Sequence, residues 1–221
     1  MTKDELIQEL IAYGYLKTQV IIEAFEKIDR RDFVPPQLQE MAYVNEPLPI
    51  GFGQTISQPL TVAFMFELLQ PKANEKILDI GVGSGWTMTM LGHIVARDIL
   101  DLKAPNVNPK VIGMERIPEL KNFAEANISK YNFISRGIVE LILGDASHGV
   151  PSELLPVYGF DKIIAAASTG EIPLDWKRQL AVNGRIVAPV KNSVVVIDKY
   201  AKDEFETKEY PGFNFVPLVQ G

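Results

Sequence analysis

The feature that most constrains this fold is a glycine-rich turn between a buried strand pattern and a helical one. Residues 76–80 form a short apolar run typical of a buried strand, and Gly81, Gly83 and Gly85 follow it directly. Glycines there allow positive φ and let a ligand approach bare backbone, while the helix after them offers unpaired N–H groups. On its own, such a turn indicates only some nucleotide-like ligand.

Strand and helix patterns alternate on both sides of this turn. A helical pattern covers residues 60–69, and strand patterns follow at 111–114, 139–143, 162–167 and 185–190, with helical patterns after the first and third of these. This alternation predicts a parallel sheet covered on both faces. Residues 194–200, 205–210 and 213–219 are strand-like with short connections, which favours an antiparallel edge. The predicted fold class is α/β, a doubly wound and mostly parallel sheet.

The first 59 residues have a different pattern. Thr2 and Glu5 have the spacing of a helix capping box, and a second amphipathic helix is expected after Thr18. Residues 41–59 have no sustained period and predict a long loop, which in a compact domain is commonly functional. We expect a single domain over 1–221, with helices and an active-site loop in 1–59 and the α/β core in 60–221.

Composition excludes several classes of protein. The 221 residues include no cysteine, which excludes disulfides and zinc sites built on cysteine. The net charge of −6 argues against a nucleic-acid partner. The acidic N-terminus and the lack of a long apolar run predict neither a signal peptide nor a membrane helix, so we expect a cytoplasmic protein.

An acid before the glycine turn narrows the ligand. The spacing is G-x-G-x-G, whereas dinucleotide sites use G-x-G-x-x-G, and Asp79 stands at the strand end. A carboxylate there repels a pyrophosphate and favours a ligand with an ammonium group. S-adenosylmethionine fits, because it is cationic and carries no phosphate.

Two further acids stand at strand ends. Glu115 closes the next strand, where a carboxylate accepts hydrogen bonds from a ribose diol, and Asp145 follows the third strand, where it can accept from an adenine amino group. A single acid of this kind is more often a solvated residue or a helix cap. Three at successive carboxyl ends of parallel strands predict one ligand site.

Several stretches together resemble one family, the protein-L-isoaspartate O-methyltransferases. The most specific is 51–59 (Gly-Phe-Gly-Gln-Thr-Ile-Ser-Gln-Pro), and the resemblance extends over 31–35, 42–43, 47–50, the glycine turn, 115–120, 144–145, 171–173 and 215–218. It implies a Rossmann-like class I methyltransferase fold, S-adenosyl-L-methionine as donor and S-adenosyl-L-homocysteine as product. The implied acceptor is an isoaspartyl carboxylate in a protein or peptide, whose methyl ester closes to a succinimide and so initiates repair.

The resemblance also implies the site residues. Ser57 is the expected active-site residue, with Thr55 beside it. The peptide side is expected to include Ile56, Val216, Pro217 and Leu218. The expected donor-binding residues are Gln54, Asp79, Gly81, Gly83, Gly85, Glu115, Arg116, Asp145 and Ala146. We expect a monomer.

The implied reaction needs little acid–base catalysis by the protein. An aspartyl-type carboxylate is ionised at neutral pH, so its methylation needs no general base. His93 and His148 suggest no triad, and we interpret His148 as a loop residue near the adenine end. Our hypothesis is that Ser57 orients the acceptor carboxylate; the alternative is that Thr55 and Ser57 only satisfy loop backbone groups.

The sequence leaves several alternatives open. Trp86 either packs in the core or covers the donor's amino-acid end, and residues 216–218 form either an edge strand or a strip that pairs with substrate peptide. Trp86 stands where the family often has Tyr, and Ala166 where it often has Thr. A lengthened helix and loop is expected around 98–109. The rival functions are a methyltransferase for another carboxylate, in a small molecule or a dedicated peptide, and a non-catalytic donor-binding module; a nicotinamide oxidoreductase is disfavoured.

Overall fold

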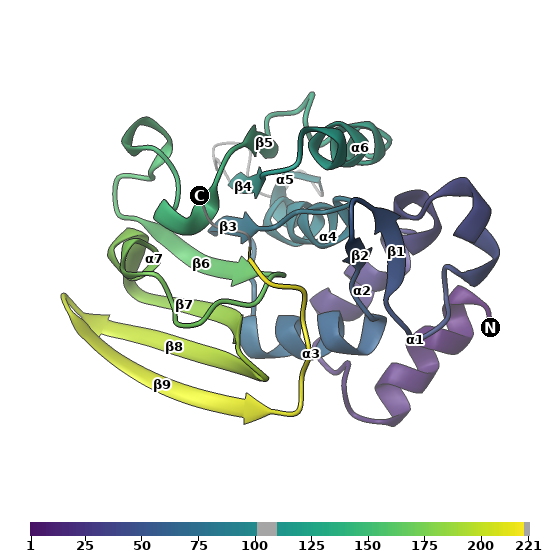
Figure 1. The fold of residues 1–221 in the computed structure, drawn as a ribbon, viewed down its shortest axis with the longest axis horizontal. Coiled ribbons are helices and arrows are strands. Elements are labelled where there is room, and N and C mark those ends of the chain that lie inside the picture. Colours follow the sequence, from purple (N-terminus) through teal and green to yellow (C-terminus); the bar gives the residue numbers. More distant parts are fainter. Residues whose placement is uncertain (101–109, 219–221) are drawn as a thin grey trace.

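A seven-stranded sheet lies at the centre of the computed structural model, which describes residues 1–100 and 110–218 (Figure 1). The strand order is β5-β4-β3-β6-β7-β8-β9. Strands β3 to β7 run parallel, while β8 and β9 are antiparallel. The fold class is therefore the one predicted. The strands are β3 (Lys76–Ile80), β4 (Lys110–Glu115), β5 (Val139–Leu143), β6 (Phe160–Ala165), β7 (Leu180–Val190), β8 (Ser193–Ala201) and β9 (Glu204–Pro211).

Apolar residues on both faces of the sheet build two clusters. Neighbouring strand residues alternate between them, as Ile77 and Leu78 do, because successive side chains of a strand point to opposite faces. Five helices pack into the first cluster: α1 (Lys3–Ala12), α2 (Gln19–Lys27), α3 (Pro59–Leu69), α4 (Trp86–Val95) and α6 (Pro118–Ser129). The second cluster is covered by α7 (Leu174–Gln179) and the short 3-10 helices η3 (Ala146–His148) and η4 (Ser152–Leu154). Both faces of the sheet are covered, one by five α-helices and the other by one short α-helix and two 3-10 helices.

The N-terminal segment holds more regular structure than its pattern predicts. Thr2 and Glu5 form the expected capping box. Helix α2 is followed by η1 (Arg30–Phe33) and η2 (Pro36–Met41). The prediction of an irregular loop over 41–59 is wrong, because strands β1 (Leu48–Gly51) and β2 (Gln54–Ile56) pair there as an antiparallel hairpin. Strands of four and three residues are too short to show a period.

The turn of this hairpin explains its glycines. Gly51, Phe52 and Gly53 have φ values of 94°, 54° and 70° in succession. Positive φ is rare for a residue with a side chain, and flanking glycines let the chain enter and leave this conformation. Phe52 is 58% exposed at the tip.

The segment after β9, residues 213–218, does not form the predicted strand, and we call it the C-terminal strap. It runs back across the molecule toward the carboxyl ends of the central strands (Figure 1). There the Ser168 N–H donates to the Val216 carbonyl at 2.8 Å, and the Leu218 N–H donates to the Ser168 carbonyl at 2.7 Å. Pro217, between them, takes no part in these two bonds and has no N–H to donate on the other side of the strap.

The expectation of a lengthened helix and loop around 98–109 falls mostly outside the described residues. Helix α5 (Arg97–Leu100) begins the segment expected to be lengthened, and 101–109 lie outside the described residues, as does Val219. Among residues 1–100 and 110–218, none of the helices is both long and apolar enough to cross a bilayer.

Candidate active site

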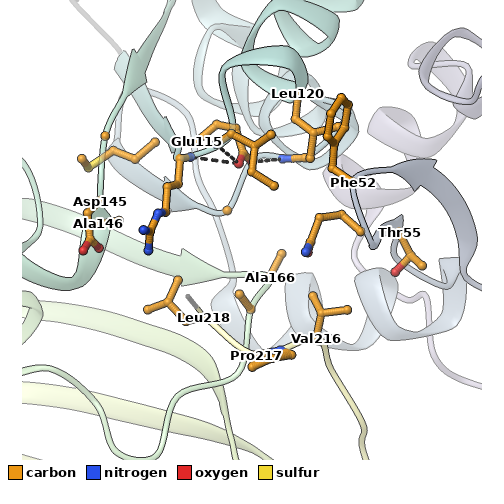
Figure 2. Close-up of a pocket in the computed structure, with 18 residues that line it drawn as sticks. Phe52, Thr55, Glu115, Leu120, Asp145, Ala146, Ala166, Val216, Pro217 and Leu218 are labelled. Carbon is orange, nitrogen blue, oxygen red and sulfur yellow. Dashed lines mark hydrogen bonds between the residues drawn. The ribbon is translucent and has the colours of Figure 1, made fainter. Parts of the chain in front are cut away.

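A cavity of about 280 Å³ opens at the carboxyl ends of β3, β4, β5 and β6 (Figure 2). Glu115 and Leu120 lie on one wall, and Val216, Pro217 and Leu218 of the C-terminal strap lie on the opposite one. Ligands of open α/β sheets bind at this edge. The remaining lining residues are Phe52, Gln54, Thr55, Gly81, Gly83, Met114, Arg116, Ile117, Gly144, Asp145, Ala146, Ala166 and Ala167.

The glycine turn adopts the backbone that its residues predict. Gly81, Gly83 and Gly85 all have positive φ, at 76°, 57° and 93°. A Cβ on Gly85 would lie 2.9 Å from Ile128 Cγ1, so a side chain there would push α6 away. Gly81 and Gly83 line the cavity, which lets a ligand contact backbone directly.

Glu115 ties the turn to the neighbouring strand. Its Oε2 accepts from the Gly83 N–H at 2.8 Å, and its Oε1 accepts from the N–H groups of Arg116 and Ile117 at 2.9 and 3.0 Å. A carboxylate has about four accepting positions, and these bonds use three. Glu115 therefore retains capacity for a ligand hydroxyl on Oε2. Arg116 is an exposed lining residue beside it.

Asp79 differs from the other two acids. It is 1% exposed, its Oδ2 accepts from the Thr87 hydroxyl at 3.0 Å, and its Oδ1 is buried without a partner. Burial raises its pKa to about 7, the charge of Glu115 adds to that rise, and the bond from Thr87 opposes it. A buried, unpaired carboxylate oxygen is costly, which fits a site completed by a cation.

The three acids do not all line one cavity. Glu115 and Asp145 belong to the lining of the large cavity, and Asp79 does not. Thr87, which donates to Asp79, lines a small pocket of about 30 Å³ that shares Thr55, Gly81, Gly83 and Ala166 with the large cavity. Asp79 is therefore connected to the site through Thr87 of the small pocket.

The expected acceptor residues lie around the small pocket. Thr55, Ile56 and Ser57 line it together with Trp86. In the described part of the chain, neither the Thr55 hydroxyl nor the Ser57 hydroxyl has a hydrogen-bond partner. That leaves both hydroxyls available to a ligand and does not favour the alternative that they only satisfy the loop backbone. Gln54 lines the large cavity.

Trp86 packs in the core, and whether it also covers the donor's amino-acid end stays a prediction. It is 2% exposed, and its ring packs edge-on against Phe25 with centroids 5.5 Å apart. It also lines the small pocket. The core therefore supplies one wall of the site.

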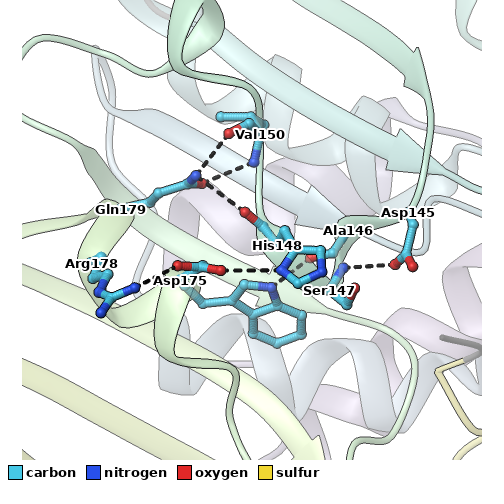
Figure 3. Close-up of polar contacts among 9 residues, drawn as sticks. Asp145, Ala146, Ser147, His148, Val150, Asp175, Arg178 and Gln179 are labelled. Atoms are coloured by element: carbon cyan, nitrogen blue, oxygen red, sulfur yellow. Dashed lines mark hydrogen bonds and ion pairs between the residues drawn. The ribbon is translucent and has the colours of Figure 1, made fainter. Parts of the chain in front are cut away.

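The opposite end of the cavity is held by helix α7, which the sequence pattern did not connect with the site. Asp145 caps η3 by accepting from the Ser147 N–H at 2.8 Å. The Trp176 indole donates to the Ala146 carbonyl at 2.7 Å. Gln179 bonds both backbone groups of Val150, at 2.9 and 2.8 Å (Figure 3). These contacts fix the loop that presents Asp145 and Ala146.

His148 lies on the outer side of this loop. Its side chain is 85% exposed, its Nδ1 lies 3.2 Å from Asp175 Oδ2, and it is not in the cavity lining (Figure 3). Contacts from His148 and Arg178 lower the pKa of Asp175.

The sequence analysis did not predict Phe52, Ile117 and Leu120 as lining residues, because their apolar side chains carry no chemical signal of a site.

The fold and the site define a class, the S-adenosylmethionine-dependent methyltransferases. The residues present fit this donor, because Asp79 offers an unpaired buried carboxylate oxygen, Glu115 keeps an accepting position and the glycine turn exposes backbone. A Plasmodium falciparum structure assigned to the protein-L-isoaspartate O-methyltransferases, in complex with S-adenosyl-L-homocysteine, superposes with a TM-score of 0.83 at 25% identity and covers 100% of both chains.

Sequence relatives specify the family. The profile of the protein-L-isoaspartate(D-aspartate) O-methyltransferase family, PCMT, matches residues 1–221. The protein-L-isoaspartate O-methyltransferase of Staphylothermus marinus is 38% identical over 218 residues, covering 97% of this chain and 92% of the relative. That of Methanopyrus kandleri is 34% identical over 221 residues, covering 98% and 91%. The chain belongs to this family, as the sequence resemblance predicted.

Proposed function

We propose that this chain transfers a methyl group from S-adenosylmethionine to the free carboxylate of L-isoaspartyl residues in proteins and peptides. One observation carries this proposal. Thr55 and Ser57, whose hydroxyls have no hydrogen-bond partner among the described residues, line the same small pocket as the glycine turn. When bound, the donor supplies an electrophilic methyl group on a sulfonium.

The donor-binding roles follow from the unused bonding capacity of Asp79 and Glu115 and from the residues that line the cavity. Asp79 would neutralise the donor's ammonium group, since its Oδ1 lacks a partner. Glu115 would accept from the ribose through Oε2. Asp145 and Ala146, at the far end of the cavity, would contact the adenine, with Gln54 and Arg116 closing the sides.

The acceptor side works by placement and exclusion of water. No proton has to leave the carboxylate, so Ser57 would act as a hydrogen-bond donor that orients one oxygen, with Thr55 as a second donor. Alignment of reacting atoms can lower a barrier by about 7–11 kcal/mol. The buried Ile56 and Trp86 surround this point with apolar surface and so keep water from it.

Residues 216–218 are also proposed to contact the substrate peptide. Their bonds with Ser168 leave the Pro217 carbonyl on the other side of the strap, so one accepting group is available for an added peptide strand. A contact through backbone alone is blind to side-chain identity, which suits an enzyme that meets damage in many sequences.

Three further expectations accompany this function: one domain over 1–221, a monomeric enzyme and a cytoplasmic location. The net charge of −6 and the absence of cysteine support the last two. Sedimentation equilibrium on the purified chain tests the monomer, and a second species at micromolar concentration contradicts it.

The direct test is transfer of radiolabelled methyl from S-adenosylmethionine to a peptide with one isoaspartyl residue, beside the same peptide with ordinary aspartate. We expect label only in the isoaspartyl peptide. Label in a different carboxylate compound alone would favour the rival methyltransferase, and donor binding in calorimetry without transfer would favour a non-catalytic module.

Replacement of Ser57 tests its role within this assay. We expect Ser57→Ala to lower kcat by about tenfold, the scale of one lost hydrogen bond to a charged group, while leaving donor affinity unchanged. Unchanged transfer by a folded variant would remove Ser57 from the mechanism.

A further inference from the structure

Arg30 is a buried cation without a buried acid beside it. It is 2% exposed at the start of η1, and its guanidinium donates to the carbonyls of Ala42, Glu46 and Ser57 at 2.5, 3.0 and 3.1 Å. Its Nε is buried without a partner. In the described part of the chain, no carboxylate forms an ion pair with it. The groups that its guanidinium contacts are therefore neutral: three backbone carbonyls and the face of the Trp86 ring.

Such an arrangement is costly and so calls for a reason. Burying a charge without a counter-charge is among the least favourable events in folding. Burial lowers the pKa of Arg30 to about 9, which still leaves the guanidinium protonated at neutral pH. Neutral donors could hold the same three carbonyls. The positive charge of Arg30 is therefore not neutralised by an acid that contacts it in the described part of the chain.

The charge stands next to the proposed acceptor point. The guanidinium contacts the Ser57 carbonyl, and its Cζ lies 5.3 Å from the ring centroid of Trp86. Ser57 and Trp86 both line the small pocket. Asp79, beneath the glycine turn, supplies negative charge to the same pocket through Thr87. The pocket is thus bordered by one buried cation, Arg30, and by two buried acids, Asp79 and, through Gly83, Glu115.

We propose that Arg30 is a positioning residue that fixes Ser57 and supplies the positive charge against which the isoaspartyl carboxylate binds. This inference rests on the proposed function and specifies how its anionic acceptor is recognised. A guanidinium bonded directly to the carboxylate would occupy the lone pairs that must attack. The Arg30 guanidinium instead contacts Ser57, which lines the pocket. From there it attracts the carboxylate through a low-dielectric interior and leaves the carboxylate oxygens free.

The test compares two peptides by equilibrium binding to the enzyme saturated with S-adenosylhomocysteine. One peptide carries the isoaspartyl carboxylate, and in the other that group is the uncharged amide. We expect wild-type enzyme to prefer the carboxylate by about tenfold or more. R30Q, which removes the charge, should lose this preference, and R30K, which keeps it, should retain most of it. R31Q is the matched control, because it removes the exposed neighbouring charge, and it should behave as wild type.

Each outcome bears on the proposal. Equal weakening of both peptides by R30Q would show a purely structural role and overturn it, as would an unchanged preference in R30Q or a lost one in R30K. If R30Q fails to bind S-adenosylhomocysteine, R30M provides a second uncharged variant with the same expectation. A wild-type enzyme that labels isoaspartyl peptide yet shows no preference overturns this inference alone, whereas absence of labelling overturns the proposed function with it.

Discussion

The two ends of the donor cavity are built on opposite principles. Beneath the glycine turn, Asp79 keeps a buried oxygen without a partner. At the far end, the loop around Ala146 is held by the indole of Trp176 and the amide of Gln179. The first end has an unpaired buried carboxylate oxygen, while the second is held in shape by hydrogen bonds within the protein. The difference suggests that charge recognition and shape recognition of the donor are assigned to separate parts of the chain.

The substitution expected to have the largest effect on donor binding is Asp79→Asn. The amide keeps the shape and removes the charge, so we expect affinity for S-adenosylhomocysteine to fall on the order of 100-fold, as when one partner of a buried ion pair is lost. The donor-free protein should unfold at an equal or higher denaturant concentration, because a desolvated charge has been removed.

Asp145→Asn is the matched change at the other end. Asparagine caps helices nearly as well as aspartate, so the loss of donor affinity should be tenfold or less, about 1.4 kcal/mol at most. Calorimetric titration of both variants measures the contrast. Equal losses would mean that the two ends are not distinct.

Lower pH should reproduce part of the Asp79→Asn effect. The pKa of Asp79 is raised to about 7 in the folded protein, so the folded state takes up a proton as pH falls through 7, whereas the unfolded chain does so near its ordinary value of about 4. The contribution of this group to donor-free stability therefore rises as pH falls from about 8 to about 4.

Donor affinity should move in the opposite direction over the same range. A protonated Asp79 cannot pair with an ammonium group, so we expect about tenfold weaker binding of S-adenosylhomocysteine at pH 6 than at pH 8. Asp79→Asn should show a flat profile. A slope that persists in this variant would assign the titration to another group.

Trp176→Phe tests the preformed end. The substitution removes the buried bond from the indole to the Ala146 carbonyl, which should lower the free energy of unfolding by about 1–3 kcal/mol. We expect a loss of donor affinity of only about threefold, because the loop loses one of several restraints. Chemical denaturation and calorimetry measure the two effects, and a donor loss matching that of Asp79→Asn would contradict the comparison.

His148→Ala should have the smallest effect. The imidazole is 85% exposed, and its contact with Asp175 is open to solvent, where ion pairs contribute little. Donor affinity should stay within about twofold of wild type, with unfolding unchanged. A clear loss of affinity would place His148 against the adenine after all.

The sequence predicted the parts of the site that depend on local pattern. Strand β3 begins and ends at the predicted residues, and Glu115 lies at the end of β4 as expected. The glycine turn has the positive φ that its residues indicate. These features follow from residue type and spacing over about ten residues, so no tertiary information is needed to infer them.

Other parts depended on contacts that no local pattern encodes. Residues 216–218 of the C-terminal strap bond to Ser168, and the Ala146 carbonyl bonds to Trp176, thirty residues away in the chain. The hairpin strands are too short for a period. Asp79 was placed correctly on its strand, but whether its side chain faces the cavity depends on how the following turn folds over it.

The positions of the two tryptophans make this chain its own optical probe. Trp86 borders the pocket beside Asp79, Trp176 supports the loop at the far end, and the sequence contains no other tryptophan. Both are at most 2% exposed, so their emission should be blue-shifted and little quenched by iodide. In Trp176→Phe all tryptophan emission comes from Trp86, which lets stopped-flow spectroscopy with selective tryptophan excitation follow events at one end of the cavity.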